Sequence, residues 1–385
     1  MKKILFLMEE LEMTGASKSL LALLDALKDS SYDISLFLFS HDGDLIKSLP
    51  KYVKLLPQKF AYWVERAPLK RAVIAAIKCG RIDLAIWRIV VGLARHFDWN
   101  FPGWFMLPRV EGKWDVACAY CDGLIAPTLL RKVSAVRKFS WIHCDYTKYP
   151  QHKETYEALE KMDGIVAVSK KALEQFDQAM APRKARQRYI IHNIVDAEEC
   201  RQKAGTGKSE NRAWPKIVTV GRLSEEKGMG LIPAIASKIR RDFEWVVIGS
   251  GPLEGGMRDA LMRLNIVDRV RMIGALDNPM PEVASADIVV IPSKSEAWGM
   301  TLSEALVLGK PVVATDLPVF REQVTDGVNG LLCPLNDVDA FAAAINRLMR
   351  DEDLRNRLSA EAIKYPFTKE RVVEEFAAVI EEVCN

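Results

Sequence analysis

Short apolar runs rich in Val and Ile alternate along the whole chain with longer segments whose apolar residues recur at helical spacing. The apolar runs are continuous rather than interrupted by polar residues, which is typical of parallel strands buried on both faces. Repeated strand–helix–strand units with right-handed crossovers predict a doubly wound α/β fold. The predicted strands are Ile4–Met8, Ile34–Phe39, Val53–Leu56, Val116–Tyr120, Phe139–Ile142, Ile165–Val168, Tyr189–Ile191, Ile217–Val220, Trp245–Ile248, Val270–Ile273, Ile288–Ile291, Pro311–Ala314 and Gly330–Cys333.

The length of 385 residues indicates two domains, each with its own sheet. The stretch from Lys203 to Arg212 is polar, holds turn-forming residues and lacks periodicity, so it marks the seam. Apolar positions at helical spacing between Thr368 and Val383 predict a final helix. We expect an N-terminal domain over 1–200, a linker over 201–214, a C-terminal domain over 215–367, and a helix over 368–385 that returns to the N-terminal domain.

Ligands of doubly wound sheets bind beside the carboxyl ends of the strands. With two such domains, the expected site lies in the cleft where the two sheets face each other. Candidate site residues should therefore stand just after predicted strands.

The net charge of +3 conceals an uneven distribution. Residues 1–190 carry 30 Lys and Arg against 21 Asp and Glu, a net charge of +9, whereas residues 191–385 carry 24 against 30, a net charge of −6. A basic first half and an acidic second half indicate two units with different binding partners. The hydrophobic share of 49% excludes a disordered or fibrous chain.

The first residues imitate a signal peptide, but the apolar run Ile4–Met8 is shorter than the about 7–15 residues of a signal-peptide core. No segment approaches the about 18 apolar residues of a membrane-spanning helix. Seven scattered cysteines indicate a reducing compartment, so we expect a cytoplasmic protein. Cys118 and Cys121 have the spacing of a redox or zinc pair, but we favour a buried strand there, because no second pair with ligand spacing occurs.

The segment 69–97 indicates contact with a membrane, because its basic residues gather mostly in one arc of a helical projection and the rest of its surface is apolar. Gly80 is expected to divide it into two helices, which either lie on anionic lipid at the inner face of the cytoplasmic membrane or pack on their own domain. The basic set is Arg71, Lys78, Arg81, Arg88 and Arg95, and the apolar set is Val73, Ile77, Leu84, Trp87 and Val91. The aromatic residues that follow, which extend the candidate contact to residue 105 or belong to the core, are Trp99, Phe101, Trp104 and Phe105.

The first motif with chemical content runs from Gly221 to Gly228, directly after the predicted strand Ile217–Val220. Arg222 and Lys227 place two cations beside the start of a helix, which suits a diphosphate. The alternative is a surface ion-pair network with the acidic residues between them, Glu225 and Glu226.

The second motif, Ser295–Ala305, follows the predicted strand Ile288–Ile291. Glu296 stands in a loop and Glu304 in the helix after it, with seven residues between them. Gly299 allows the backbone to approach a ligand, and the N–H groups that open the helix (Met300, Thr301 and Leu302) can bind a phosphate. Two carboxylates with free amides suit a sugar nucleotide. The alternative is a pair of solvated glutamates at a helix start.

Taken together, these motifs resemble the retaining glycosyltransferases of family 4, which have the GT-B fold of two Rossmann-like domains facing across a cleft. The resemblance covers most of residues 215–350, in the family's order, and its N-terminal part is looser. The further matching segments are Val246–Leu253, Gly309–Thr315 and Asp326–Leu332.

The resemblance implies a role for each matched position. Arg222 and Lys227 hold the donor diphosphate, Glu296 faces the donor sugar, and Glu304 binds the nucleotide ribose. The backbone of Gly299, Met300, Thr301 and Leu302 clamps the phosphate, and Gly221 allows the sharp exit from its strand. The base lies against Gly274, Ala275 and Leu276, which follow the predicted strand Val270–Ile273.

The N-terminal domain is the acceptor side in this resemblance. The loop at Thr14 departs from the family's double glycine and Ser17 replaces its acidic residue, but Gly15 still brings a backbone N–H to the donor phosphate. His143 follows the predicted strand Phe139–Ile142 in a sequence similar to enzymes that build bacterial surface polysaccharides. We expect His143 to lie beside the transferred sugar and give Asp145 a secondary role.

The resemblance implies a retaining, metal-independent hexosyltransferase that moves a hexose from a nucleotide-diphosphate sugar, by default a UDP-hexose, to a glycan or lipid-linked saccharide acceptor. The leaving phosphate oxygen accepts the proton in a front-face substitution. We expect no cofactor and no nucleic-acid partner. Two alternatives are a sugar-nucleotide epimerase of the same architecture and a non-catalytic sugar-nucleotide-binding scaffold.

Overall fold

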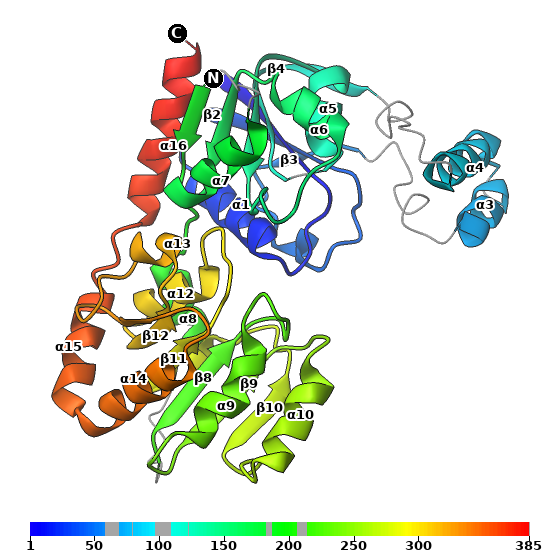
Figure 1. Ribbon diagram of the computed structural model, residues 1–385. Helices are drawn as coiled ribbons and strands as arrows, with labels where there is room; N and C mark the ends of the chain where they lie inside the picture. The colour runs from blue at the N-terminus through cyan, green and yellow to red at the C-terminus, as the bar shows by residue number, and fades with distance from the viewer. Residues whose placement is uncertain are drawn as a thin grey trace. The chain divides into compact units, whose positions relative to one another are not determined.

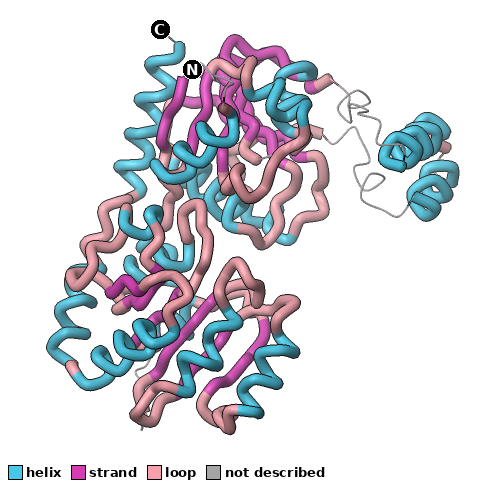
Figure 2. The backbone as a smooth tube through the Cα atoms, in the orientation of Figure 1, coloured by secondary structure: helices cyan, strands magenta, loops and turns pink. Residues whose placement is uncertain are grey.

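The computed structural model describes residues 1–57, 69–78, 80–96, 109–121, 123–181, 187–205 and 214–384. The chain divides into two compact units. Unit 1 comprises Met1–His192 with Val373–Asn385, and unit 2 comprises Asn193–Val372. Figures 1 and 2 show strands flanked by helices in each unit.

Unit 1 contains a parallel sheet of seven strands in the order β3-β2-β1-β4-β5-β6-β7. Its strands are β1 (Lys2–Met8), β2 (Tyr32–Leu38), β3 (Lys54–Leu55), β4 (Val110–Ala119), β5 (Val133–Ile142), β6 (Gly164–Ala167) and β7 (Gln187–Ile190). Its helices are α1 (Gly15–Ala26), the short 3-10 helix η1 (Asp44–Ser48), α3 (Leu69–Lys78), α4 (Ile82–His96), α5 (Ile125–Lys132), α6 (Lys153–Leu159) and α7 (Lys170–Met180).

Unit 2 contains a parallel sheet of six strands in the order β10-β9-β8-β11-β12-β13. Its strands are β8 (Lys216–Val220), β9 (Glu244–Ile248), β10 (Val270–Gly274), β11 (Ile288–Ile291), β12 (Val312–Thr315) and β13 (Leu331–Cys333). Its helices are α8 (Ala197–Ala204), η3 (Met229–Leu231), α9 (Ile232–Ser237), α10 (Glu254–Arg263), α11 (Met280–Ala284), α12 (Met300–Val307), α13 (Pro318–Arg321), α14 (Val338–Arg350) and α15 (Glu352–Ala362).

Both sheets have the same winding. In each, the first strand along the chain pairs with the second on one side and the fourth on the other, as β8 pairs with β9 and β11. All thirteen predicted strands are present, which confirms the predicted doubly wound α/β fold. The continuous apolar runs are buried as predicted, and Ile4 and Ile288 are fully enclosed. The crevice of such a sheet opens where the connections diverge to opposite sides, which is between β1 and β4 in unit 1 and between β8 and β11 in unit 2.

The boundary between the two units does not coincide with the linker expected over 201–214. Helix α8 covers part of that range and contacts α11 and α12 of unit 2. The burial of Cys200 and Ala204 explains why α8 packs on unit 2. The remainder of the expected linker, 206–213, lies outside the described residues.

The final helix α16 (Lys369–Cys384) joins unit 1 from Val373 onward. The ring of Phe376 lies 6.2 Å from that of Phe6 and 6.4 Å from that of Trp141. Glu375 accepts hydrogen bonds from the backbone N–H of His192 (3.0 Å) and lies 2.9 Å from its ring Nδ1. The predicted helical spacing of apolar residues therefore serves the core of unit 1.

Helices α3 and α4 form a pair that contact each other, as Figure 1 shows. Gly80 separates them with φ of +70°, and the N–H of Arg81 donates to the carbonyl of Ala76 (2.9 Å), an ending that favours glycine. The predicted faces are partly wrong. Arg88 is 5% exposed, so it does not belong to a solvated basic face, and Leu84 and Trp87 are buried as well. The side chains of Val91 and Arg95 and the aromatic residues from Trp99 to Phe105 lie outside the described residues.

Two further sequence expectations bear on this fold. Cys118 is buried in β4, and burial raises the pKa of its thiol, so this position has the character of a structural strand residue. Within the ranges given above, no helix combines the length and apolar character needed to cross a bilayer.

Candidate active site

The two motifs singled out from the sequence meet at the carboxyl edge of the unit 2 sheet. The loop after β8 and the loop after β11 lie on either side of the point where the sheet connections diverge. The backbone N–H of Lys294 donates to the carbonyl of Glu226 at 2.8 Å, which joins the two loops directly. Sheet topology thus brings together residues about 70 positions apart in the sequence.

Gly228 makes this close approach between loops feasible. Its φ is +65°, a left-handed conformation that favours glycine, and a Cβ at this position would lie 1.8 Å from the carbonyl oxygen of Pro292. Only a residue without a side chain allows the β8 loop to rest on the β11 loop in this way.

Lys227 and Glu296 form an ion pair across the joined loops, with 2.7 Å between Nζ and Oε1. The hydroxyl of Ser293 donates to the same carboxylate oxygen at 2.9 Å. The two charged side chains are 29% and 11% exposed, so the pair is largely shielded from water. Partial burial strengthens such a pair and fixes the direction of the glutamate.

The remaining charges around the loops are arranged differently from the ion-pair network considered as an alternative. Glu225 pairs with Lys294 (2.8 Å) rather than with Arg222 or Lys227. Arg222 is exposed, and across the described parts of the chain no acidic partner is recorded for it. An unneutralised guanidinium in the loop that also carries Lys227 is suited to an anionic ligand.

Helix α12 begins at the end of the β11 loop. Gly299 is its N-cap with φ of +92°, and a Cβ there would lie 2.5 Å from Cε1 of Phe320. The N–H of Leu302 donates to the carbonyl of Gly299 (2.9 Å), so this predicted phosphate donor is already engaged. The amides of Met300 and Thr301 have no acceptor recorded among the described residues, and they open a helix whose dipole favours anions.

A buried polar network supports this turn from within the unit. Gln323 donates through Nε2 to the carbonyl of Trp298 (2.7 Å), and Ser303 donates to Oε1 of Gln323 (2.7 Å). The hydroxyl of Tyr365 lies 2.8 Å from the Ser303 hydroxyl and 3.0 Å from Gln323 Oε1. Burial raises the pKa of Tyr365, so its hydroxyl remains a proton donor. Such satisfied networks hold local backbone rigidly.

The other residues of unit 2 that are predicted to bind the nucleotide sugar lie on the same edge or close to it. Glu304 sits half-buried on α12, and its charge contributes, after burial, to raising the pKa of Cys200 on α8 to about 12. Gly274 ends β10, where its carbonyl accepts from Gly249 (2.8 Å), and Ala275 and Leu276 follow it, exposed at the strand's carboxyl end. Gly221 leaves β8 with its N–H bonded to Ile248 (2.9 Å).

In unit 1, His143 lies at the carboxyl end of β5, beside that of β4. Its ring is 4.7 Å from the ring of Tyr120, and the Tyr120 hydroxyl is 2.9 Å from that of Ser19 on α1. Although part of His143 is exposed, its Nε2 is buried, and no hydrogen-bond partner for this atom exists within the described residues. Burial lowers the pKa of His143 to about 3, so the imidazole is neutral.

The other unit 1 candidates have local roles. Thr14 caps α1 by accepting from the N–H of Ser17 (3.3 Å), so the residues that depart from the family pattern form the helix start at Gly15. Asp145 is buried and accepts from the amide and hydroxyl of Thr147 (3.0 and 2.6 Å) and from Gln175 (2.6 Å). This carboxylate is occupied in holding its own turn.

Sequence reasoning missed three residues that shape these sites: Ser293, Tyr120 and Gln323. Ser293 stands two residues after the end of β11, so its position after a strand could have revealed it. Tyr120 is the last residue of a predicted strand, and no motif in the sequence marks it as a site residue. Gln323 carried no recognisable pattern, because its contacts are formed in the tertiary structure alone.

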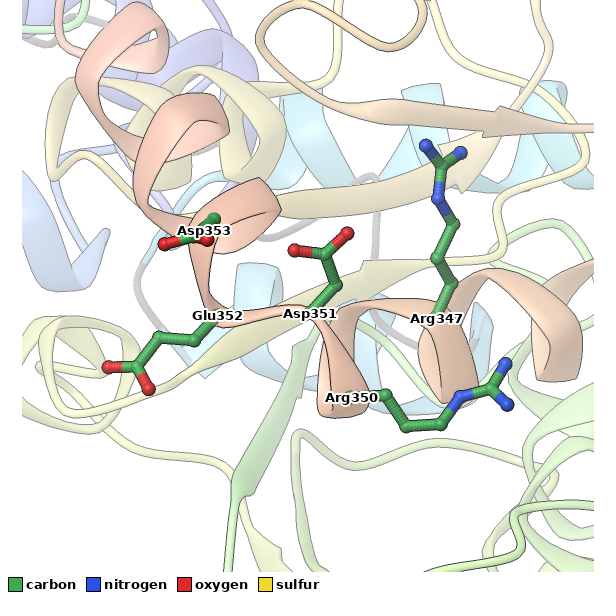
Figure 3. Close-up of a pocket in the computed structure, with 5 residues that line it drawn as sticks. All are labelled: Arg347, Arg350, Asp351, Glu352 and Asp353. Atoms are coloured by element: carbon green, nitrogen blue, oxygen red, sulfur yellow. The ribbon is translucent and has the colours of Figure 1, made fainter.

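No group of three or more His, Cys, Asp or Glu side chains is placed to hold a metal ion within the described residues. A recess at the junction of α14 and α15 contains none of the candidate site residues (Figure 3). Asp351, one of the residues that line it, caps α15 by accepting a hydrogen bond from the N–H of Leu354 (2.8 Å), so this carboxylate has a structural role. The recess is lined by Arg347, Arg350, Asp351, Glu352 and Asp353.

Comparison with solved structures identifies the fold class. The structure of HepE from Anabaena in complex with UDP superposes on 99% of this chain and 100% of its own, with a TM-score of 0.72 and 17% sequence identity. The identity is too low to carry more than the fold. The chain has the GT-B fold, which confirms the prediction.

Sequence comparison identifies the domain. Residues 201–365 match the family Glycosyl transferases group 1, so this part of the chain is a domain of that family and the resemblance seen in the motifs is confirmed. The chain is 31% identical over 160 residues, 40% of its length, to alpha-D-kanosaminyltransferase of Streptomyces kanamyceticus. It is 27% identical over 169 residues, 43% of its length, to the lipopolysaccharide core biosynthesis glycosyltransferase LpsE of Rhizobium meliloti. These matches span 42% and 49% of the two relatives' lengths, about half of each.

Proposed function

We propose that this protein is a retaining, metal-independent glycosyltransferase that moves a hexose from a nucleotide-diphosphate sugar, by default a UDP-hexose, in the cytoplasm. The acceptor is a glycan or lipid-linked saccharide in bacterial surface-glycan synthesis. The observation that carries the proposal is the Lys227–Glu296 pair, formed between the loop that holds Arg222 and the loop that leads into α12. The UDP bound to HepE and the role in lipopolysaccharide core biosynthesis that LpsE's name records support it.

The donor diphosphate is the ligand that these charges suit best. Arg222 supplies a planar guanidinium without an acidic partner among the described residues, and the amides of Met300 and Thr301 supply donors at a helix N-terminus. These groups stabilise the charge that develops as the diphosphate leaves. Fixed donors of this kind usually make the largest contribution to catalysis.

Lys227 links the phosphate and the sugar in this proposal. Its ammonium has three N–H donors, of which one bonds Glu296, so two remain for phosphate oxygens. Glu296 is held by Lys227 and Ser293 and accepts hydrogen bonds from hydroxyls of the hexose. We assign it to positioning the sugar rather than to nucleophilic attack.

The nucleoside is assigned to the neighbouring strand ends. Glu304 binds the ribose hydroxyls, and Gly274, Ala275 and Leu276 receive the base at the end of β10. Exposure of Ala275 and Leu276 leaves an apolar surface on which a flat base can lie.

His143 is assigned to a hydrogen bond with a sugar hydroxyl. Its imidazole is neutral because burial lowers its pKa to about 3, and its Nε2 has no partner among the described residues. A neutral ring orients a hydroxyl without adding charge. The acceptor proton goes to the leaving phosphate oxygen, on the same face of the sugar, so the anomeric configuration is retained.

Donor binding is tested first by thermal stabilisation with UDP, GDP, ADP and their hexose derivatives, because a ligand of the native state raises the melting temperature. Transfer is then measured with the stabilising donor and short glycan or lipid-linked acceptors. The anomeric configuration of the product, read by NMR, tests retention, and omission of the acceptor tests the epimerase alternative.

The site assignment is tested with Lys227→Ala and Glu296→Gln. Each variant should lose about 100-fold or more in kcat/KM, as expected for loss of a charged group that acts in the transition state. Lys294→Ala is the matched control, because it lies in the same loop but pairs with Glu225, and its activity should stay within about threefold of wild type. Folded Lys227→Ala and Glu296→Gln variants with normal transfer would refute the assignment, and donor binding with no transfer to any acceptor would favour the scaffold.

A further inference from the structure

The helix pair α3–α4 exposes an unusual amount of apolar surface. Seven of the nineteen large hydrophobic side chains that are exposed in the described residues fall within positions 69–93. Single exposed apolar residues are ordinary, but contiguous groups mark binding surfaces. The seven are Leu69, Ile74, Ile77, Ile82, Ile86, Ile89 and Leu93.

Four of these residues form one line along α4, which we name the α4 stripe: Ile82, Ile86, Ile89 and Leu93. Their spacing of four, three and four places them on a single side of the helix. Their exposed fractions run from 44% to 64%. Leu84 and Trp87 occupy the opposite side of the same helix and are buried, so α4 is apolar both inward and outward.

The pair is also strongly basic. Residues 69–97 contain six Lys and Arg and a single acidic residue, Asp83. Asp83 is paired with Arg81 at 2.7 Å, which removes the one local negative charge. Lys70, Arg71 and Lys78 are exposed on α3, around Ile74 and Ile77. An apolar stripe accompanied by unneutralised cations is complementary to a surface that is apolar inside and anionic outside.

We infer that α3–α4 docks on a bilayer containing anionic lipid, with the α4 stripe inserted among the acyl chains and the α3 cations on the lipid headgroups. The docking rests on α3 and α4 alone. Only the step from membrane docking to a lipid-linked acceptor rests on the proposed function. The inserted side is therefore the exposed isoleucine side of α4, not the Leu84 and Trp87 side expected from the sequence.

A second copy of the chain is the competing occupant. The charge pattern disfavours it, because pairing two copies through this surface would bring together two sets of exposed α3 cations, Lys70, Arg71 and Lys78. A bilayer with anionic headgroups meets the same surface with opposite charge.

Docking is tested by flotation of the full chain with vesicles of phosphatidylcholine containing about 30% phosphatidylglycerol, and with pure phosphatidylcholine, at about 0.05 M and 0.5 M NaCl. We expect binding to the anionic vesicles that weakens strongly with salt. The triple variant Ile82→Ser/Ile86→Ser/Ile89→Ser should bind about tenfold more weakly or worse. Lys70→Gln/Arg71→Gln/Lys78→Gln should lose about 100-fold at low salt.

Matched controls change the same residue types elsewhere. Met262→Ser/Leu264→Ser/Val267→Ser removes three equally exposed apolar residues from unit 2, and Lys28→Gln/Lys47→Gln/Lys51→Gln removes three exposed lysines from unit 1. Both control variants should bind the anionic vesicles within about twofold to threefold of wild type. Lys227→Ala should float normally, which separates failure of the proposed transfer from failure of docking.

Absence of flotation at low salt would overturn the inference, as would equal losses in the control variants. A dimer in light scattering that becomes a monomer in the Ile82→Ser/Ile86→Ser/Ile89→Ser variant, without vesicle binding, would assign the surface to a second copy instead.

Discussion

The carboxyl edges of the two sheets share one topology and differ in electrostatics. In unit 2 the edge is ionic: Lys227 and Glu296 lie 2.7 Å apart, and Arg222 stands in the same loop as Lys227. In unit 1 the two rings at the ends of β4 and β5 are neutral: His143 packs on Tyr120, and burial keeps the pKa of His143 at about 3. The same winding therefore carries different chemistry at the carboxyl edge of each sheet.

The difference shows how one scaffold serves two kinds of ligand. A diphosphate needs cations and amides held before it arrives, which unit 2 has in its joined loops. A sugar hydroxyl needs oriented neutral hydrogen-bonding groups, which unit 1 has around His143. The contacts described for the two sites also differ: Gly228 allows a close backbone approach in unit 2, and the His143 ring packs on Tyr120 in unit 1.

The prediction with the largest expected effect disrupts the close backbone approach between the β8 loop and the β11 loop of unit 2. Gly228→Ala adds a Cβ where the Pro292 carbonyl oxygen would lie 1.8 Å away, at φ of +65°. The left-handed conformation costs roughly 1–2 kcal/mol and overpacking roughly 1–3 kcal/mol, so we expect a loss of about 2–4 kcal/mol in the free energy of unfolding. Chemical denaturation of unit 2, followed by circular dichroism, measures it.

Gly256→Ala is the matched control for that substitution. Gly256 lies in α10 with nothing within 4 Å of an added Cβ, so alanine should leave stability unchanged or raise it by up to about 1 kcal/mol. Equal behaviour of the two variants would contradict the role assigned to Gly228.

The next test concerns the neutral imidazole of His143 at the end of β5. Because burial lowers the pKa of His143 from 6.5 to about 3, the unfolded chain binds a proton that the native chain lacks between these values. The contribution of neutral His143 to stability is therefore complete above about pH 6.5 and falls as the pH drops. The loss should reach about 2 kcal/mol by pH 5, from the about 1.4 kcal/mol per pH unit of one proton.

Urea denaturation between pH 7 and pH 4, compared between wild type and His143→Gln, isolates this contribution. The variant should lose less stability on acidification, whereas His152→Gln, which alters an exposed histidine, should follow wild type. Parallel curves for wild type and His143→Gln would show that the His143 environment is solvated rather than neutral and buried.

The smallest expected effect tests the support beneath the ionic edge. Tyr365→Phe removes a hydroxyl that contacts Ser303 and Gln323 but leaves their mutual hydrogen bond. The free energy of unfolding should fall by about 1 kcal/mol, with a change in donor KM below about threefold. An unchanged melting curve would mean that the network does not hold the Trp298–Gly299 turn.

Much of the fold could be predicted from the sequence. Runs such as Ile4–Met8 and Ile288–Ile291 are continuous and apolar because parallel strands are buried on both faces, and this pattern is local. The two motifs of unit 2 could be located for the same reason, since a doubly wound sheet places ligands at strand ends. The seam was harder to predict, because α8 is polar in sequence and only its contacts with α11 and α12 assign it to unit 2.

The sequence by itself determined the strands and the residue types at their ends, because both depend on neighbours along the chain. Only the tertiary structure decided that Glu296 pairs with Lys227, that Leu302 is already hydrogen-bonded, and that Arg88 is buried. Those outcomes depend on side chains and backbone brought together from distant positions.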